Sequence, residues 1–230
     1  MTPGHHLSPV LAGILIIACL CGTAAAASLG SEWKERPYTS APFTGVKFSD
    51  NGSVVWAGGD QMLVRYWDGS HKWGGRAGMV AAMSADGQWV ADGFGQSVIL
   101  LNQTMIEQWT RNMDGEVKAV AISKNATFII SADNKGNYNS WTKNGEFYGR
   151  IKDDVVKRIA ISPTDNIVVA TTENGPRIYS PAMVPIWWDN TSGNLDTYII
   201  ISGDGSTVLT LGGNRLTSLT STGEIGRAHV

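Results

Sequence analysis

A short motif that returns about every 40 residues most constrains how this chain can fold. It consists of an apolar run, a serine, a polar turn rich in Asp, Asn and Gly, and a second apolar run. The serine of each copy stands at Ser49, Ser84, Ser123, Ser162 and Ser202. The intervals between these serines are 35, 39, 39 and 40 residues. A fixed period of this length indicates a stack of similar units, each of which buries its apolar faces against its neighbours.

Each copy is predicted to consist of strands. Its apolar residues alternate or form short β-branched runs, and these runs are bounded by Gly, Asp and Asn, as at the break Asp92-Gly93. Such residues supply the positive φ angles and the side-chain hydrogen bonds of tight turns. Third strands are expected at residues 62–67, 97–101, 136–141, 177–180 and 215–219. Fourth strands are expected around Trp73, Trp109, Tyr148 and Trp187, and no amphipathic helix is predicted after residue 30.

One copy ends its third strand in the sequence MLVRYWDG, with Trp67-Asp68 near its end. Together with the serine turn, this resembles the repeat of WD-repeat β-propellers. In the predicted fourth strand, a pair of turn residues precedes a tryptophan by a few residues: 68–69 before Trp73 and 102–103 before Trp109. This pattern is similar to the repeat of propellers related to pyrroloquinoline-quinone enzymes. The resemblance covers about residues 33–223. It implies an all-β fold: a β-propeller of four-stranded antiparallel blades, with about five repeats visible in a complete or incomplete ring.

Residues 1–27 are predicted to be a secretory signal peptide. Residues 1–30 carry no Lys, Arg, Asp or Glu, and the apolar run 10–21 is followed by small residues. Two alternatives stay open. The sequence Ile-Ile-Ala-Cys ending at Cys19 resembles a lipobox, which implies lipidation of Cys19, and an uncleaved anchor would need roughly 20 apolar residues. Cys19 and Cys21 are the only cysteines, so a cleaved chain has no disulfide. The expected location is extracellular or at the cell surface.

The two ends of the repeat region carry separate expectations. The N-terminal segment 28–44 contains the sequence WKERPY at residues 33–38. We expect WKERPY to form the outer strand of the last blade, because closed propellers complete the ring with one blade built from both chain ends. The repeats occupy residues 45–223. Within 224–230, IGRAHV matches one reading frame of a common sequencing adapter, so we expect this tail to be non-native and the chain to be a fragment of a longer array. A closed five-blade ring is the alternative.

Composition argues against most catalytic classes. After residue 27 there is no Cys, and His71 and His229 are the only His residues, so a His-based metal cluster or a Ser-His-Asp triad is not expected. Residues 133–137 are rich in oxygen ligands but lack the spacing of a calcium loop. A formal net charge of −2 without a basic cluster argues against nucleic acid. We expect no cofactor, no metal, no catalytic residue and no enzyme; a quinoprotein-like enzyme with a cofactor in the central channel is an alternative.

In a propeller, the turns after strands two and four lie on one face, and here that face collects carboxylates. They are Asp60, Asp92, Asp114, Glu116, Asp133, Asp153, Asp154, Glu173 and Asp189, against Arg76, Lys135 and Lys152. An acidic face predicts binding of a cationic peptide, a polyol or a divalent ion. The simpler interpretation is that turns favour Asp and Asn.

Four N-x-[ST] sequons fall in predicted turns, at Asn51, Asn102, Asn125 and Asn190. The first three are expected on the face opposite the carboxylates. We therefore expect a secreted or surface-attached, non-catalytic binding or scaffold module whose partner is a protein or glycan at the cell surface. Membrane contact is expected only through a lipid or an N-terminal anchor. A structural component of the cell envelope is the alternative.

Overall fold

The computed structural model describes residues 45–58, 63–66, 71–74, 80–188, 198–212, 215–223 and 225–228. All belong to the second of two compact units, residues 1–36 and 37–230. Every regular element among them is a β-strand, so the all-β prediction is confirmed for this part of the chain. No helix in the described ranges is long and apolar enough to span a membrane. The predicted signal peptide and the predicted strand at 33–38 lie outside the described residues.

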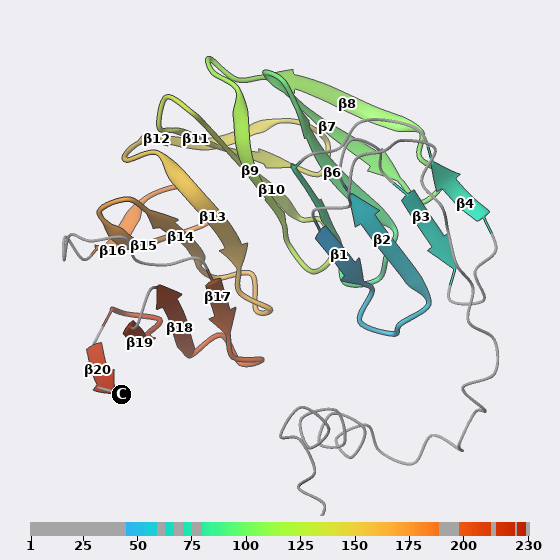
Figure 1. Cartoon of the computed structure of the whole chain (residues 1–230). Coiled ribbons are helices and arrows are strands. Elements are labelled where there is room, and N and C mark those ends of the chain that lie inside the picture. Colours follow the sequence, from blue (N-terminus) through green and yellow to red (C-terminus); the bar gives the residue numbers. More distant parts are fainter. Residues whose placement is uncertain are drawn as a thin grey trace, which may run out of the picture. The chain divides into compact units, whose positions relative to one another are not determined.

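The strands form five four-stranded sheets (Figure 1). The first contains β1 (Gly45–Phe48), β2 (Val54–Gly58), β3 (Leu63–Tyr66) and β4 (His71–Gly74). The second contains β5 (Val80–Met83), β6 (Trp89–Phe94), β7 (Ser97–Asn102) and β8 (Glu107–Asn112). The third contains β9 (Val117–Ile122), β10 (Phe128–Asp133), β11 (Asn137–Thr142) and β12 (Phe147–Lys152). The fourth contains β13 (Val156–Ile161), β14 (Val168–Thr172), β15 (Gly175–Tyr179) and β16 (Pro185–Trp188). The fifth contains β17 (Tyr198–Ile201), β18 (Thr207–Gly212), β19 (Arg215–Thr220) and β20 (Ile225–Ala228).

Within each sheet the strands follow chain order and pair antiparallel, which confirms the predicted four-stranded unit. One predicted break is wrong. The turn expected at Asp92-Gly93 lies three residues later, at 95–96, because β6 continues to Phe94 and pairs with β5 through Gly93 and with β7 through Phe94. Strand β20 consists of residues assigned above to a non-native tail, and that assignment stays a prediction.

The repeated serine is explained by the turn that follows the first strand of each sheet. Its Oγ accepts a hydrogen bond from the backbone N–H five residues later, at distances of 2.9 to 3.2 Å in all five copies. The residue three positions after the serine donates its N–H to the serine carbonyl and has a φ between 58° and 71°. These residues are Gly52, Gly87, Ala126, Asp165 and Gly205. The repeat is therefore a hairpin turn whose geometry is fixed by a serine hydroxyl, buried in the first four copies, and by one left-handed residue.

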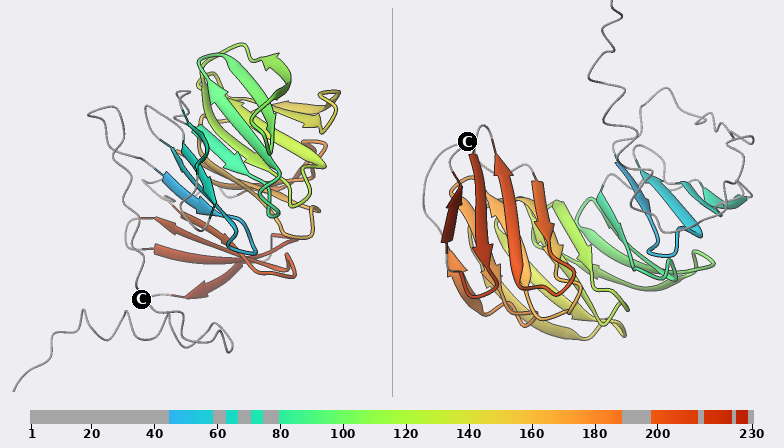
Figure 2. Two further views of the ribbon diagram at one scale, coloured as in Figure 1. Left: turned by 90° about the vertical axis from the view of Figure 1, so that its right-hand side faces the viewer. Right: turned by 90° about the horizontal axis from the view of Figure 1, so that it is seen from below.

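The core lies between consecutive sheets, which face one another as successive layers (Figure 2). Trp56 of β2 packs on Ile99 and Leu101 of β7. Tyr138 of β11 packs with Tyr179 of β15, with ring centroids 5.7 Å apart. The described strands do not form a closed ring of sheets. The coarse architecture is thus a series of similar sheets joined by apolar side chains.

The first and fifth sheets each leave an apolar face exposed. In the inner sheets, residues one and three positions before the serine pack on the preceding sheet, while Val80 and Ala82 on β5 and Ala119 on β9, two or four positions before it, pack on the next. On β1, Val46 and Phe48 point toward a preceding sheet and are 57% and 59% exposed. On β17, Ile200 points away from the fourth sheet and is 63% exposed; Tyr198 is 57% exposed, with its ring 5.3 Å from the guanidinium carbon of Arg158 on β13. Both end faces therefore expose apolar side chains, whereas apolar side chains between the inner sheets are packed against a neighbouring sheet.

Candidate functional site

The fourth sheet contains an open hollow of about 560 Å³ beside the loop that leads into it. Two of its strands and two of the turns next to them provide the walls. The lining residues are Lys152, Asp153, Asp154, Asn174, Arg177, Tyr179, Pro185, Trp187 and Trp188. All belong to β15, β16, the end of β12, the β12–β13 loop or the β14–β15 turn. The register places Arg177 opposite Trp188 and Ile178 opposite Trp187, so charge and indole rings meet across one pair of strands.

Arg177 is the central charge of the hollow. Its side chain is 5% exposed, and its Nη2 lies 2.6 Å from Asp154 Oδ2. Its Nε lies 3.6 Å from Asp153 Oδ1, and its Nη1 donates to the carbonyl oxygen of Pro176 at 3.3 Å. A guanidinium at this depth requires charged or polar partners, because its removal from water is otherwise costly. The two adjacent carboxylates supply them.

Two tyrosines fix the same loop from behind. Tyr179 donates its hydroxyl to Asp153 Oδ2 at 2.7 Å, and Tyr138 donates its hydroxyl to the backbone oxygen of Asp154 at 2.7 Å. Burial raises the pKa of the Tyr179 hydroxyl far above its ordinary value, and the hydrogen bond to Asp153 raises it further. Burial and the nearby charge of Asp153 likewise raise the pKa of Tyr138. Both hydroxyls therefore stay protonated donors at any physiological pH.

Gly136, in the β10–β11 turn, allows the loop to approach the third sheet. Its carbonyl oxygen accepts a hydrogen bond from the N–H of Asp153 at 2.9 Å. Its φ is +76°, and a Cβ at this position would overlap the backbone oxygen of Asp153. Only glycine meets both requirements without strain. The position of the two carboxylates thus depends on a residue 17 positions earlier in the chain.

The open side of the hollow combines an aromatic surface with polar groups. Trp188 is 57% exposed, whereas Trp187 is half-buried and packs against Gly223 of the fifth sheet. The Asn174 side chain and the Lys152 side chain are exposed at the rim. Lys152 and Arg177 balance Asp153 and Asp154, so the formal charges of the lining cancel. The arrangement suits binding: it offers donors, acceptors and an indole surface whose positions are set by the protein.

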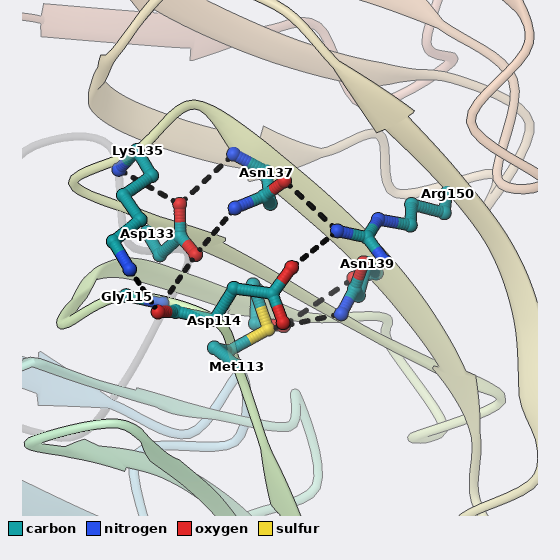
Figure 3. A network of polar contacts seen from close by, with 9 residues as sticks. Met113, Asp114, Gly115, Asp133, Lys135, Asn137, Asn139 and Arg150 are labelled. Carbon is teal, nitrogen blue, oxygen red and sulfur yellow. Dashed lines mark hydrogen bonds and ion pairs between the residues drawn. The ribbon is translucent and has the colours of Figure 1, made fainter.

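A second polar cluster surrounds Asp133 (Figure 3). Its Oδ1 accepts hydrogen bonds from the backbone N–H groups of Lys135 and Asn137, both at 2.9 Å. Its Oδ2 accepts from the N–H of Gly115 and from Asn137 Nδ2, both at 2.8 Å. Burial alone raises the pKa of Asp133, but these four donors outweigh burial and hold the pKa below its ordinary value. Asp133 therefore ties the β10–β11 turn to the β8–β9 loop.

Cations of the third sheet accompany the carboxylates of the β8–β9 loop. Asp114 forms an ion pair with Arg150, whose Nη2 also donates a hydrogen bond to Asn137 Oδ1 at 2.9 Å (Figure 3). The backbone oxygen of Asp114 accepts a hydrogen bond from Lys135 Nζ. Glu116 pairs with Lys118 at 2.8 Å on the exposed surface. These carboxylates are largely neutralised by their own neighbours. The described residues hold no group of three or more His, Cys, Asp or Glu side chains that could bind a metal ion.

The described carboxylates of the predicted acidic face lie in the following places. Asp153 and Asp154 meet in the hollow, and Asp114 and Asp133 share the second cluster. Asp92 lies inside β6 and is fully buried, while Glu173 is exposed in the β14–β15 turn. Asp60 and Asp189 lie outside the described residues. Arg177, Tyr179 and Trp188 are not among the site residues predicted from the sequence; the available signal is an Arg between apolar residues in the predicted strand, followed by Trp-Trp.

Two of the predicted turn positions are confirmed, and the third sequon asparagine ends a strand. Asn51 is in the β1–β2 turn, Asn125 is in the β9–β10 turn, and Asn102 ends β7. The Oδ1 of Asn102 accepts from the N–H groups of Thr104 and Ile106, so this side chain shapes its own turn. Their use for glycosylation stays a prediction. Asn190 and Cys19 lie outside the described residues.

A comparison with models of known protein families finds none that matches this chain, and a comparison with curated proteins finds no match. The function is therefore argued from the fold and from the hollow of the fourth sheet.

Proposed function

We propose that this chain is a β-propeller that acts as a non-catalytic binding module and holds its ligand in the hollow formed by β15, β16 and the β12–β13 loop. Four-stranded antiparallel sheets in chain order, each facing the next, are the units of propellers. The open apolar faces of β1 and β17 add support, because every blade of a propeller is packed on both faces. Export to the outside of the cell, inferred from residues 1–27, belongs to the same proposal.

The hollow of about 560 Å³ is the observation that carries the binding role. Ligand pockets have volumes of roughly 300 to 1,000 Å³ and combine aromatic walls with a few fixed polar groups. Here Tyr179, Tyr138 and Arg177 hold Asp153 and Asp154 in place before any ligand arrives. The raised pKa values of both tyrosines and the paired guanidinium suit recognition better than proton transfer at neutral pH.

The test is a screen of immobilised glycans and peptides with the purified chain and three variants. Trp188→Ala and Asn174→Ala alter the rim of the hollow, and Phe94→Ala removes an equally accessible aromatic side chain, 50% exposed, from the second sheet. We expect at least one probe to bind and both rim variants to weaken that binding, while Phe94→Ala leaves it unchanged. Binding that neither rim variant affects would place the ligand elsewhere and overturn the proposal.

Location is tested separately by expressing the complete gene in an exporting host. We expect the mature protein outside the cytoplasm, with a new N-terminus at about residue 28. A mature chain that begins with acylated Cys19 would support the lipoprotein alternative. Retention of residues 1–27 on a cytoplasmic protein would contradict export.

A further inference from the structure

We infer that the ligand of this hollow is a neutral, polyhydroxylated molecule: a saccharide without charged groups. The inference rests on the proposed binding function and specifies the chemical class that the lining recognises. Three properties of the lining carry it: its balance of charge, its arrangement of donors and acceptors, and its exposed indole.

Charge excludes the two ionic classes. Asp154 is already paired with Arg177 at 2.6 Å, and Asp153 accepts the hydroxyl of Tyr179 at 2.7 Å. A cationic ligand would have to compete with a buried guanidinium, which would be left without a counter-ion if the ligand took the carboxylate. An anionic ligand would lie beside two carboxylates that are 27% and 32% exposed. A neutral ligand meets neither obstacle.

Donors and acceptors at the rim match hydroxyl groups. Asp154 keeps its Oδ1 as an acceptor, because the ion pair engages Oδ2. The side-chain amide of Asn174 provides donors and an acceptor, and Lys152 provides a donor. A sugar hydroxyl donates one hydrogen bond and accepts others, so neighbouring hydroxyls can satisfy a carboxylate oxygen and an amide at the same time. A purely apolar ligand would leave these groups unpaired, which is costly.

The exposed indole completes the match. Trp188 is 57% exposed beside β15, whose side chains are all buried, and it lies across the strand pair from Arg177. The face of an indole carries negative electrostatic potential, which attracts the weakly positive C–H groups on one face of a pyranose ring. The hydroxyl groups at the ring edge then point toward the polar rim. A flat apolar face and a polar edge are the combination that sugar rings present.

The test uses isothermal titration calorimetry with three sets of probes: neutral oligosaccharides of glucose, galactose, mannose and N-acetylglucosamine; trilysine; and trigalacturonate. We expect at least one neutral saccharide to bind, with an affinity that is nearly unchanged between about 0.05 M and about 0.5 M salt, because no net charge is involved. Trp188→Ala should weaken this binding by roughly tenfold, and Trp188→Phe should restore part of the loss. Phe94→Ala should leave it unchanged.

Three results would overturn the inference. The ligand class would be rejected if trilysine or trigalacturonate bound and no neutral saccharide did. If that binding also depended on Trp188, the proposed binding site would still hold. Saccharide binding that is insensitive to Trp188→Ala and Asn174→Ala would reject the hollow, and with it the proposed function. Failure of every neutral saccharide to bind would reject the saccharide. Circular dichroism melts of each variant show whether a loss of binding reflects unfolding.

Discussion

Arg177 is the residue on which the geometry of the hollow depends, because its one charge is shared by Asp153 and Asp154. Replacing it with Met would leave both carboxylates without their cation in a partly buried place. Breaking a fully buried pair costs about 3 to 5 kcal/mol, and partial exposure of the two carboxylates reduces this figure. We expect Arg177→Met to lower the free energy of unfolding by about 1 to 3 kcal/mol in urea titrations.

Lys118→Met is the matched control for Arg177→Met. Lys118 pairs with Glu116 on the surface, with side chains that are 42% and 55% exposed. Surface pairs contribute little, so we expect a change below about 0.5 kcal/mol. Equal effects of the two substitutions would show that the Arg177 pair is no more important than a surface contact.

Asp133 predicts a specific dependence of stability on pH. Its folded-state pKa is below the unfolded value of about 3.9, so its ionised form stabilises the fold above that pH, and this contribution is lost as the pH falls through the folded value. Asp133→Asn places an amide donor against four existing donors, and we expect a loss of about 1 to 3 kcal/mol at pH 7. The difference from the unmodified protein should shrink as the pH falls from about 5 to about 2. A difference that stays constant across this range would contradict the assignment.

At the scale of the strand and turn, Gly136 tests whether the β10–β11 turn and the β12–β13 loop depend on each other. Gly136→Ala would introduce both a strained φ of +76° and an overlap with the backbone of Asp153. Gly95→Ala introduces the strain alone, since φ is +57° and no atom lies within 4 Å of the added Cβ. The control should cost about 1 to 2 kcal/mol and Gly136→Ala clearly more. Equal losses of stability in urea unfolding would show that the β12–β13 loop moves away from the added methyl group without a further loss of stability.

Local turn chemistry explains how much of these elements the sequence predicts. A serine hydroxyl that accepts the N–H five residues later, as Ser84 does from Trp89, leaves a readable pattern of Ser and Asx in each copy, with Gly at the left-handed position in three of the five. The break at Asp92-Gly93 was misplaced because both residue types also favour turns, while here the burial of Asp92 and the pairing of both residues with β5 and β7 keep them inside β6.

The site was only partly predictable because it joins residues from different sheets. Asp153 and Asp154 were expected on a loop face and do line the hollow. The local signal of Arg177, a charge in an otherwise apolar strand, does not reveal its partners, because they stand more than 20 residues earlier and meet it only when the third and fourth sheets pack. The charge balance of the hollow, which decides the class of ligand, follows from that contact.

At the scale of the whole molecule, the open face of the fifth sheet tests the propeller. Ile200 on β17 is 63% exposed, and Ile106, in the second sheet's last turn, is 61% exposed. If another sheet covers β17 in the native protein, Ile200→Lys buries an unpaired charge and should destabilise by about 1 to 3 kcal/mol. Ile106→Lys should change stability by less than about 0.5 kcal/mol. Equal, small effects in thermal or urea unfolding would show that the face is not covered.

The central claim is that a ligand occupies the hollow of the fourth sheet, and amide hydrogen exchange with and without a saturating neutral oligosaccharide tests it most directly. The account predicts slower exchange in residues 152–154, 174–179 and 185–188, and unchanged exchange around Asp114 and Asp133. Protection centred on the Asp114–Asp133 cluster, or on no part of the fourth sheet, would contradict it.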